Sequence, residues 1–200
     1  MAEFEKLLHQ QGFLRIAGVD EAGRGACAGP LVVAAAVLPT EHPKLNLCAD
    51  SKSLSEKDRE ARFEVIKDLA LAFSIVEISS VEIDQFGLHE CNLTGMRRAV
   101  AALEIVPDFI LTDGYAIEGL TTAHLAMWKG DAVSLSIGAA SILAKVHRDR
   151  IMRELAIAFP QYGFEEHKGY ATARHTASLQ SFGITPVHRK SFANIAALST

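Results

Sequence analysis

The sequence has few of the features that would set it apart from ordinary globular proteins. It contains only three cysteines, none of them in a C-x-x-C pair, so we expect neither a disulfide framework nor a zinc site. This cysteine usage favours a reducing, cytoplasmic environment. The longest apolar run covers residues 31–38, whereas a membrane-spanning helix needs about 20 such residues. The first ten residues include Glu3 and Glu5 and lack an export signal. We therefore expect a protein without a membrane segment.

Acidic residues are absent from the end of the sequence. No Asp or Glu follows Glu166, whereas 16 basic and 24 acidic residues lie at or before that position. The basic residues that follow it are Lys168, Arg174, Arg189 and Lys190. This asymmetry is compatible with a basic, substrate-binding arm over about residues 160–200, beside an acidic pocket, and equally with a solvated tail.

Some apolar segments have the length and pattern of strands and others have the periodicity of helices, which predicts an α/β fold. Strands are expected at residues 13–19, 31–38, 71–78, 109–112 and 121–128, and helices at 56–69, 81–104, 133–158 and 171–181. Three glycines and a proline crowd residues 23–30, so the first two strands are expected to be neighbours. The order of the elements favours a mixed central β-sheet flanked by helices, in a single domain over residues 1–200 with a small C-terminal helical segment.

Two adjacent carboxylates, Asp20 and Glu21, follow the first predicted strand. Strand alternation would send them to opposite faces, and a turn that begins at Ala22 would bend Glu21 back to the face of Asp20. Buried carboxylates are costly unless they are paired or bind a metal ion. A strand end that emerges into water with a solvated acidic pair is the simpler alternative.

Two further acids occupy similar positions. Asp113 follows the strand at 109–112, and Asp131 lies just before the long helix at 133–158. Functional sites of α/β proteins are commonly built at such boundaries. Taken alone, Asp113 has the position of a turn residue and Asp131 that of a helix N-cap.

Four carboxylates in one pocket would repel each other. Each pair costs about 4 kcal/mol at about 4 Å and an effective dielectric constant near 20. Divalent cations relieve this repulsion, and a ligand set made only of oxygens favours Mg²⁺ or Mn²⁺. The pattern therefore suggests a metal site formed by Asp20, Glu21, Asp113 and Asp131.

Residues 23–28 also match the pattern G-x-G-x-x-A of dinucleotide-binding proteins. That fingerprint requires a helix to begin at this point, so that the helix N-terminus meets the pyrophosphate. Gly29, Pro30 and a predicted strand follow here instead. The match is weak evidence for a nucleotide site.

Taken together, eight stretches of the sequence closely resemble bacterial ribonuclease HII. They are GVDEAGRG (18–25), GPLVVAAAVL (29–38), DSKSLSEKDRE (50–60), LTDGY (111–115), KGDA (129–132), AASILAKVHRD (139–149), HKGYAT (167–172) and HRKSF (188–192). They occur in order and span nearly the whole chain. The resemblance implies a ribonuclease H-like fold and a metal-dependent endoribonuclease that hydrolyses the RNA strand of RNA–DNA hybrids. It also implies cleavage on the 5′ side of a single ribonucleotide embedded in duplex DNA, which leaves 3′-hydroxyl and 5′-phosphate ends.

The resemblance also implies roles for individual residues. The family's catalytic and metal-binding carboxylates fall on Asp20, Glu21, Asp113 and Asp131, with two Mn²⁺ or Mg²⁺ ions between them. Its substrate-binding positions fall on Gly23, Arg24, Gly25, Lys52 and Tyr170, and Lys168 is a further candidate for a phosphate contact. A buried core aromatic is the plain alternative for Tyr170.

Several rival functions remain open at this point. Ribonuclease HIII and Holliday-junction resolvases are metal nucleases of the same fold, and a hybrid-binding module without activity is a further alternative. The expected partners are RNA–DNA hybrid and ribonucleotide-containing duplex DNA, and a monomer is the default expectation.

Overall fold

A computed structural model of the chain describes residues 3–48 and 54–198. Its five strands form one mixed sheet in the order β3-β2-β1-β4-β5. The strands are β1 (Ile16–Ala22), β2 (Leu31–Val37), β3 (Ala72–Ile78), β4 (Phe109–Asp113) and β5 (Ala123–Met127). The pairs β1–β2 and β2–β3 are antiparallel, whereas β1–β4 and β4–β5 are parallel. The expected mixed sheet is confirmed.

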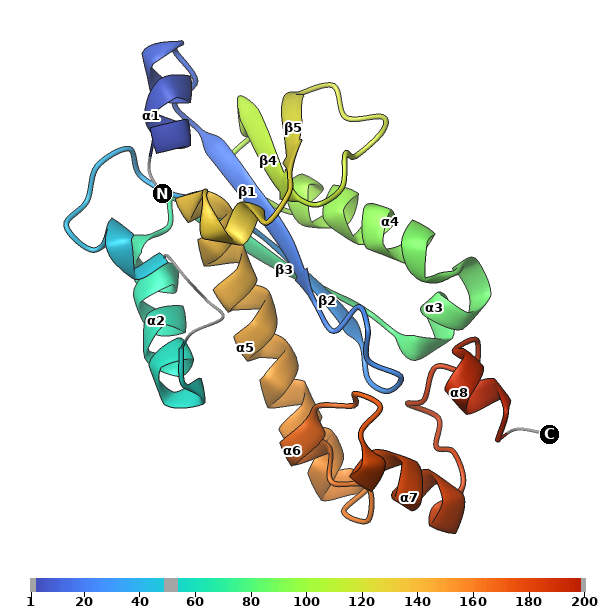
Figure 1. Ribbon diagram of the computed structural model, residues 1–200. Coiled ribbons are helices and arrows are strands. Elements are labelled where there is room, and N and C mark those ends of the chain that lie inside the picture. Colours follow the sequence, from blue (N-terminus) through green and yellow to red (C-terminus); the bar gives the residue numbers. More distant parts are fainter. Residues whose placement is uncertain (1–2, 49–53, 199–200) are drawn as a thin grey trace.

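Helices cover both faces of this sheet, as Figure 1 shows. One face carries α2 (Glu56–Leu69) and α5 (Leu135–Ala158), and the other carries α3 (Ser80–Phe86) and α4 (Leu88–Ala101). β2 is buried along its whole length, because Val33 and its alternate neighbours pack toward α4 while Val32, Ala34 and Ala36 pack toward α5. A strand covered on both faces has a continuous apolar sequence, which accounts for the run at 31–38.

Several element boundaries differ from those expected. The helix expected at 81–104 is two helices, because Gly87 between them has a φ of 84° and breaks the hydrogen-bonded ladder. β1 begins later than expected and continues through Ala22. The structure also has short helices that the sequence did not predict: α1 (Glu3–Gln10), η1 (Leu45–Cys48), η2 (Gly130–Ala132), α6 (Phe164–His167) and α8 (Ala193–Ala196).

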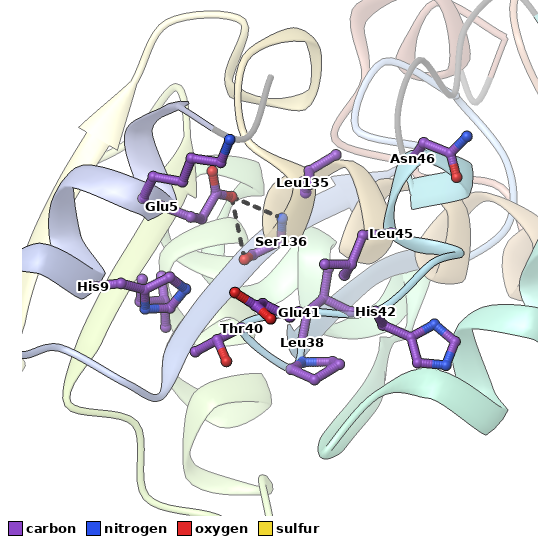
Figure 2. A pocket seen from close by; sticks show the side chains of 13 residues that line it. Glu5, His9, Leu38, Thr40, Glu41, His42, Leu45, Asn46, Leu135 and Ser136 are labelled. Carbon is purple, nitrogen blue, oxygen red and sulfur yellow. Dashed lines mark hydrogen bonds between the residues drawn. The ribbon is translucent and has the colours of Figure 1, made fainter.

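The helix α1 is fixed to the start of α5 by a buried carboxylate. Glu5 Oε1 accepts hydrogen bonds from Ser134 Oγ at 2.6 Å, Ser136 N at 3.1 Å and Ser136 Oγ at 3.3 Å. A negative charge at a helix N-terminus is stabilised by the free N–H groups and the helix dipole. Figure 2 shows the two bonds between Glu5 and Ser136 at the edge of a cavity, which has a volume of about 520 Å³ and is also lined by His9, Leu38 and His42. None of the residues with a predicted functional role lines this cavity.

The C-terminal segment packs around the far end of α5. It contains α6, α7 (Ala173–Phe182) and α8, and its core includes Tyr162, Phe164 and Leu179 packed against Met152 of α5 and Cys27 of the β1–β2 connection. Figure 1 shows this segment beside the loop that joins β1 to β2. Among the described residues, no helix has the length and apolar character needed to cross a bilayer.

The closest approach between α5 and the sheet occurs at Gly18. A Cβ atom at this position would lie 2.0 Å from the backbone carbon of Ser136, so only glycine fits. We expect Gly18→Ala to lower the free energy of unfolding by about 3 kcal/mol, because the backbones must separate. Gly95→Ala is the matched control. Its Cβ would meet side-chain atoms rather than backbone, with Ile78 Cδ1 at 2.4 Å and Val33 Cγ2 at 2.8 Å, and alanine favours the helix, so the loss should be smaller. Urea unfolding measures both variants, and equal losses would contradict the prediction.

Candidate active site

Three carboxylates meet where β1 and β4 end side by side. The parallel register pairs Val19 with Thr112, so Asp20 and Asp113 are the next residues on neighbouring strands. Asp20 is 5% exposed, which excludes the solvated acidic pair as its explanation. Its carboxylate accepts a hydrogen bond from the Glu21 backbone N–H at 2.7 Å and a further one from Ser141 of α5.

Asp20 and Glu21 approach this site from opposite faces of β1. Asp20 contacts Ser141 of α5, whereas Glu21 interacts with Asn92 of α4. The expected bend at Ala22 is wrong, because the strand continues through that residue. Both carboxylates nevertheless border one hollow, where β4 ends at Asp113 while β1 continues beside it to Ala22.

The hollow has a volume of about 370 Å³ and mixed charge. It is lined by three acids, by three cationic side chains, and by the glycine-rich turn that follows β1. The lining side chains are those of Asp20, Glu21 and Asp113, of Arg24, Arg59 and Lys145, and of Ser141 and Tyr170, with Gly23 and Gly25 between them. This arrangement can hold cations at its floor and a polyanion at its rim.

Burial and neighbouring charge raise the pKa of two of the three carboxylates, Asp20 and Glu21. Burial raises the pKa of Asp20 well above its usual value, and the charges of Glu21 and Asp113 raise it further. Burial and Asp113 also raise the pKa of Glu21 to about 7, against the opposing effect of Arg24 and Asn92. Strongly raised carboxylate pKa values in a cleft are typical of functional sites.

Asp131 lies next to this group but is not among the described side chains that line the hollow. It is 3% exposed in η2, and the N–H of the preceding Gly130 donates to Asp113 Oδ1 at 2.6 Å. The N-cap of α5 is Ser134, whose Oγ accepts from Ile137 N, so an N-cap role for Asp131 is wrong. Of the predicted substrate-binding residues, Lys52 lies outside the described residues.

The glycine-rich turn places its backbone against Tyr170. Gly23 has a φ of 86°, and a Cβ there would lie 1.8 Å from Arg148 Nε. Gly25 is exposed, and a Cβ there would lie 3.7 Å from Tyr170 Cε1, an ordinary contact. Tyr170 is 42% exposed, so it is not a core aromatic. The turn leads into β2, so the pattern at 23–28 is followed by a strand and not by the helix N-terminus that a dinucleotide site requires.

The structure divides the four basic residues that follow Glu166: Lys168 and Arg189 are buried, whereas Arg174 and Lys190 are exposed. Lys168 is 9% exposed, its Nζ donates to Glu165 O at 2.7 Å, and it pairs with Glu56 at 3.6 Å. Arg189 is fully buried, and Arg174 forms an ion pair with Glu166. Lys168 therefore does not reach the hollow, and its expected phosphate contact is not supported by its position. The structure uses these cations to bind carbonyl and carboxylate oxygens of the protein itself.

Sequence reasoning missed four polar residues of this region. Arg59, Ser141 and Lys145 line the hollow, and Arg148 fills the space beside Gly23. Three of them lie in the stretch 139–149, and the helical spacing of Ser141, Lys145 and Arg148 places them on one side of α5. The helical spacing of these three residues was therefore a signal in the sequence that they share one face of the helix.

The donor set fits a divalent cation. Carboxylate oxygens are the ligands that Mg²⁺ and Mn²⁺ prefer, and Glu21 Oε2 is buried without a hydrogen-bond partner among the described residues. No three acidic, histidine or cysteine side chains in the described part of the chain are arranged as a closed metal-binding cluster. The repulsion within the group of Asp20, Glu21 and Asp113 is what a bound cation would relieve.

Comparison with known proteins gives a consistent result over nearly the whole chain. Residues 17–195 match the family model of ribonuclease HII. The ribonuclease HII of Salinispora arenicola is 52% identical over 196 residues, which cover 98% of this chain and 73% of that protein.

Solved structures show the same architecture. The crystal structure of ribonuclease H2 from Pyrococcus horikoshii matches with a TM-score of 0.81 at 27% identity, covering 92% of this chain and 96% of that one. A ribonuclease HIII crystallised in complex with Mn²⁺ matches with a TM-score of 0.68 at 19% identity, covering 96% and 71%. At that identity the second likeness concerns the fold alone.

The raised carboxylate pKa values predict that the metal-free protein loses stability as the pH rises. Because the folded pKa values of Asp20 and Glu21 lie above the unfolded ones, the folded state binds more protons between about pH 5 and about pH 8. For Glu21, the rise from 4.5 to about 7 corresponds to up to about 3 kcal/mol. Urea unfolding in a chelator measures this loss. The Asp20→Asn variant should be more stable than the parent near pH 8 and less sensitive to pH, and parallel curves for the two proteins would contradict the assignment.

Proposed function

The chain belongs to the ribonuclease HII family and is an endoribonuclease that acts on RNA in RNA–DNA hybrids; we propose that it also cuts on the 5′ side of a single ribonucleotide in duplex DNA, leaving 3′-hydroxyl and 5′-phosphate ends. The observation that carries the proposal is the composition of the 370 Å³ hollow. Its carboxylates, cations, glycine backbone and exposed aromatic ring are the groups needed to hydrolyse a phosphodiester next to a particular sugar.

We assign the acids of the hollow to cation binding. Asp20, Glu21 and Asp113 would hold divalent ions, with Asp131 as the fourth ligand residue beside Asp113. When bound, such ions activate the attacking water and stabilise charge on the leaving 3′ oxygen. Ser141 orients the Asp20 carboxylate, and the Gly130 N–H orients that of Asp113.

The cations at the rim would contact the phosphates on either side of the cleavage position. Arg24, Arg59 and Lys145 border the hollow from three different segments. Lys145 Nζ is held by Asp149 at 2.5 and 2.7 Å, which keeps the ammonium group in place at the rim. Contacts to phosphates position the strand but carry no information about the sugar.

Recognition of the ribonucleotide requires groups that reach its 2′-hydroxyl, because that hydroxyl distinguishes it from the neighbouring deoxyribonucleotides. The backbone at Gly25 is exposed and has no side chain to hold a sugar away. The ring of Tyr170 lies beside it and offers a stacking surface and a hydroxyl. We assign the reading of the ribonucleotide to this pair.

Three substrates test the reaction: a duplex with one embedded ribonucleotide, a long RNA–DNA hybrid, and a four-way DNA junction. With Mn²⁺ or Mg²⁺, we expect cleavage of the first two, a 3′-hydroxyl end on the 5′ side of the ribonucleotide, and no cleavage of the junction. Excess chelator removes the cations, and Asp20→Asn removes one of the carboxylates proposed to bind them. Each should reduce the rate by at least about a thousandfold. Cleavage of the hybrid alone would favour a ribonuclease HIII-like specificity, and cleavage of the junction would favour a resolvase.

The glycine-rich turn offers a matched pair of variants. Gly25→Ala meets only an ordinary contact with Tyr170 in the free protein, so its stability should stay within about 0.5 kcal/mol of the parent. Cleavage at a single ribonucleotide should nevertheless fall at least about tenfold, because the methyl group holds the sugar away from the backbone. Gly23→Ala should instead destabilise the fold, because its φ is positive and Arg148 occupies the space. An active and stable Gly25→Ala variant would place the sugar contact elsewhere.

A further inference from the structure

Two buried histidines connect the C-terminal segment to Tyr170. His188 and His175 are 1% and 0% exposed, and their Nε2 atoms lie 3.0 Å apart. At one end, His188 Nδ1 lies 2.9 Å from Thr185 N and 2.8 Å from Thr185 Oγ1. At the other end, His175 Nδ1 lies 2.9 Å from the carbonyl oxygen of Tyr170. The four residues form one continuous hydrogen-bonded chain.

Both ends of this chain dictate where the protons lie. The backbone N–H of Thr185 can only donate, so His188 Nδ1 accepts and the neutral ring carries its proton on Nε2. That proton is donated to His175 Nε2, which leaves the proton of His175 on Nδ1. The Tyr170 carbonyl can only accept, and it receives this proton. One arrangement of protons, with two neutral rings, satisfies every bond.

The surroundings keep both rings neutral. Burial lowers the pKa of His188 to about 4, with a further contribution from His175, and burial also lowers the pKa of His175. The ring of His167 stacks on His175 with centroids 4.4 Å apart. The N–H of Gly169 donates to His167 Nδ1, and His167 Nε2 lies 2.7 Å from Tyr162 O.

The Tyr170 backbone needs such a support, because it lies in an irregular loop. Lys168 and Gly169 have φ values of 50° and 81°, both in the left-handed region. The Tyr170 carbonyl accepts only from the local Thr172 N–H and from His175 among the described residues. Thr172 is the N-cap of α7, so the bond from His175 is a second link between this carbonyl and α7, and through His188 it connects the carbonyl to the segment after that helix.

We propose that His188 and His175 are positioning residues that hold Tyr170 over the carboxylate hollow, so that its ring is set to read a single ribonucleotide. The proposal rests on the function proposed for Tyr170. Neither histidine lines the hollow or reaches the substrate. Their contribution is the hydrogen bond to the Tyr170 carbonyl, and the direction of every bond behind it fixes that carbonyl in one position.

Two substitutions at His188 separate this role from general packing. The amide of Gln can reach the position of Nε2 and donate to His175, whereas the shorter amide of Asn replaces only Nδ1 and keeps the Thr185 contact. We expect His188→Asn to lower kcat/KM for a duplex with one ribonucleotide about fivefold, as for the loss of one hydrogen bond. His188→Gln should stay within about twofold of the parent.

A double-mutant cycle with Tyr170→Ala supplies the decisive comparison. Tyr170→Ala should itself lower cleavage at the single ribonucleotide about 10- to 100-fold. In that background His188→Asn should cause no further loss, because the ring that it positions is gone. A loss that persists in the Tyr170→Ala background, or equal effects of Asn and Gln, would overturn the positioning role. If Tyr170→Ala has no effect, the function proposed for Tyr170 fails and the positioning role fails with it.

A measurement on the unaltered protein tests the hydrogen bonds from Thr185 through His188 and His175 to Tyr170, even if a His188 variant does not fold. The ¹⁵N resonances of the imidazole rings report which nitrogen carries the proton. We expect a protonated Nε2 on His188 and a protonated Nδ1 on His175, both unchanged near neutral pH. The opposite tautomer on either ring, or a doubly protonated ring, would overturn the proposal.

Discussion

A buried guanidinium that bonds to no carboxylate among the described residues holds the candidate site together. Arg148 of α5 donates to the carbonyl oxygens of Pro30 at 2.9 Å, Lys168 at 2.9 Å and Ala28 at 3.1 Å, and lies 5.7 Å from the centre of the Tyr170 ring. A charge removed from water is costly unless strong hydrogen bonds replace its hydration. The three carbonyls supply them, and they come from two loops that are distant in the sequence. The turn after β1 and the loop that carries Tyr170 therefore keep a common position against the long helix.

The carboxylates present the opposite situation, because burial and mutual repulsion oppose their charged forms. Asp20 and Glu21 are buried beside Asp113, whose charge raises the pKa of both. Charges that oppose folding persist where function requires them. The helix α5 packs closely against β1 at Gly18, two residues before Asp20. The same group that weakens the metal-free fold is the one that attracts a divalent cation, so binding and stability are linked.

Two buried cations change what the charge count at the C-terminus means for substrate binding. An excess of basic residues after Glu166 suggested a surface that binds phosphates, but Lys168 and Arg189 are directed inward. Arg189 donates to the carbonyls of Gly29 and Arg24, so it supports the same turn as Arg148 from the other side. Formal charge is a property of composition, whereas access to a polyanion depends on which side chains the loops must use for their own carbonyls. The sequence contains no signal for that choice.

The sequence by itself determined the mixed α/β sheet, because a two-sided apolar strand such as β2 and the helical periodicities around it follow from burial alone. It also determined which acids stand at strand ends, and the structure brings Asp20, Glu21 and Asp113 into one hollow. Local signals did not predict the break at Gly87 or the helix α1, since short helices depend on contacts such as that of Glu5 with α5. Only the tertiary structure decided that Asp20 and Glu21 reach the hollow from opposite faces of β1, and that buried arginines and histidines support the loops around it. The physical reason is that strand position is encoded in local pattern, whereas a hydrogen bond between distant segments exists only after the chain has folded.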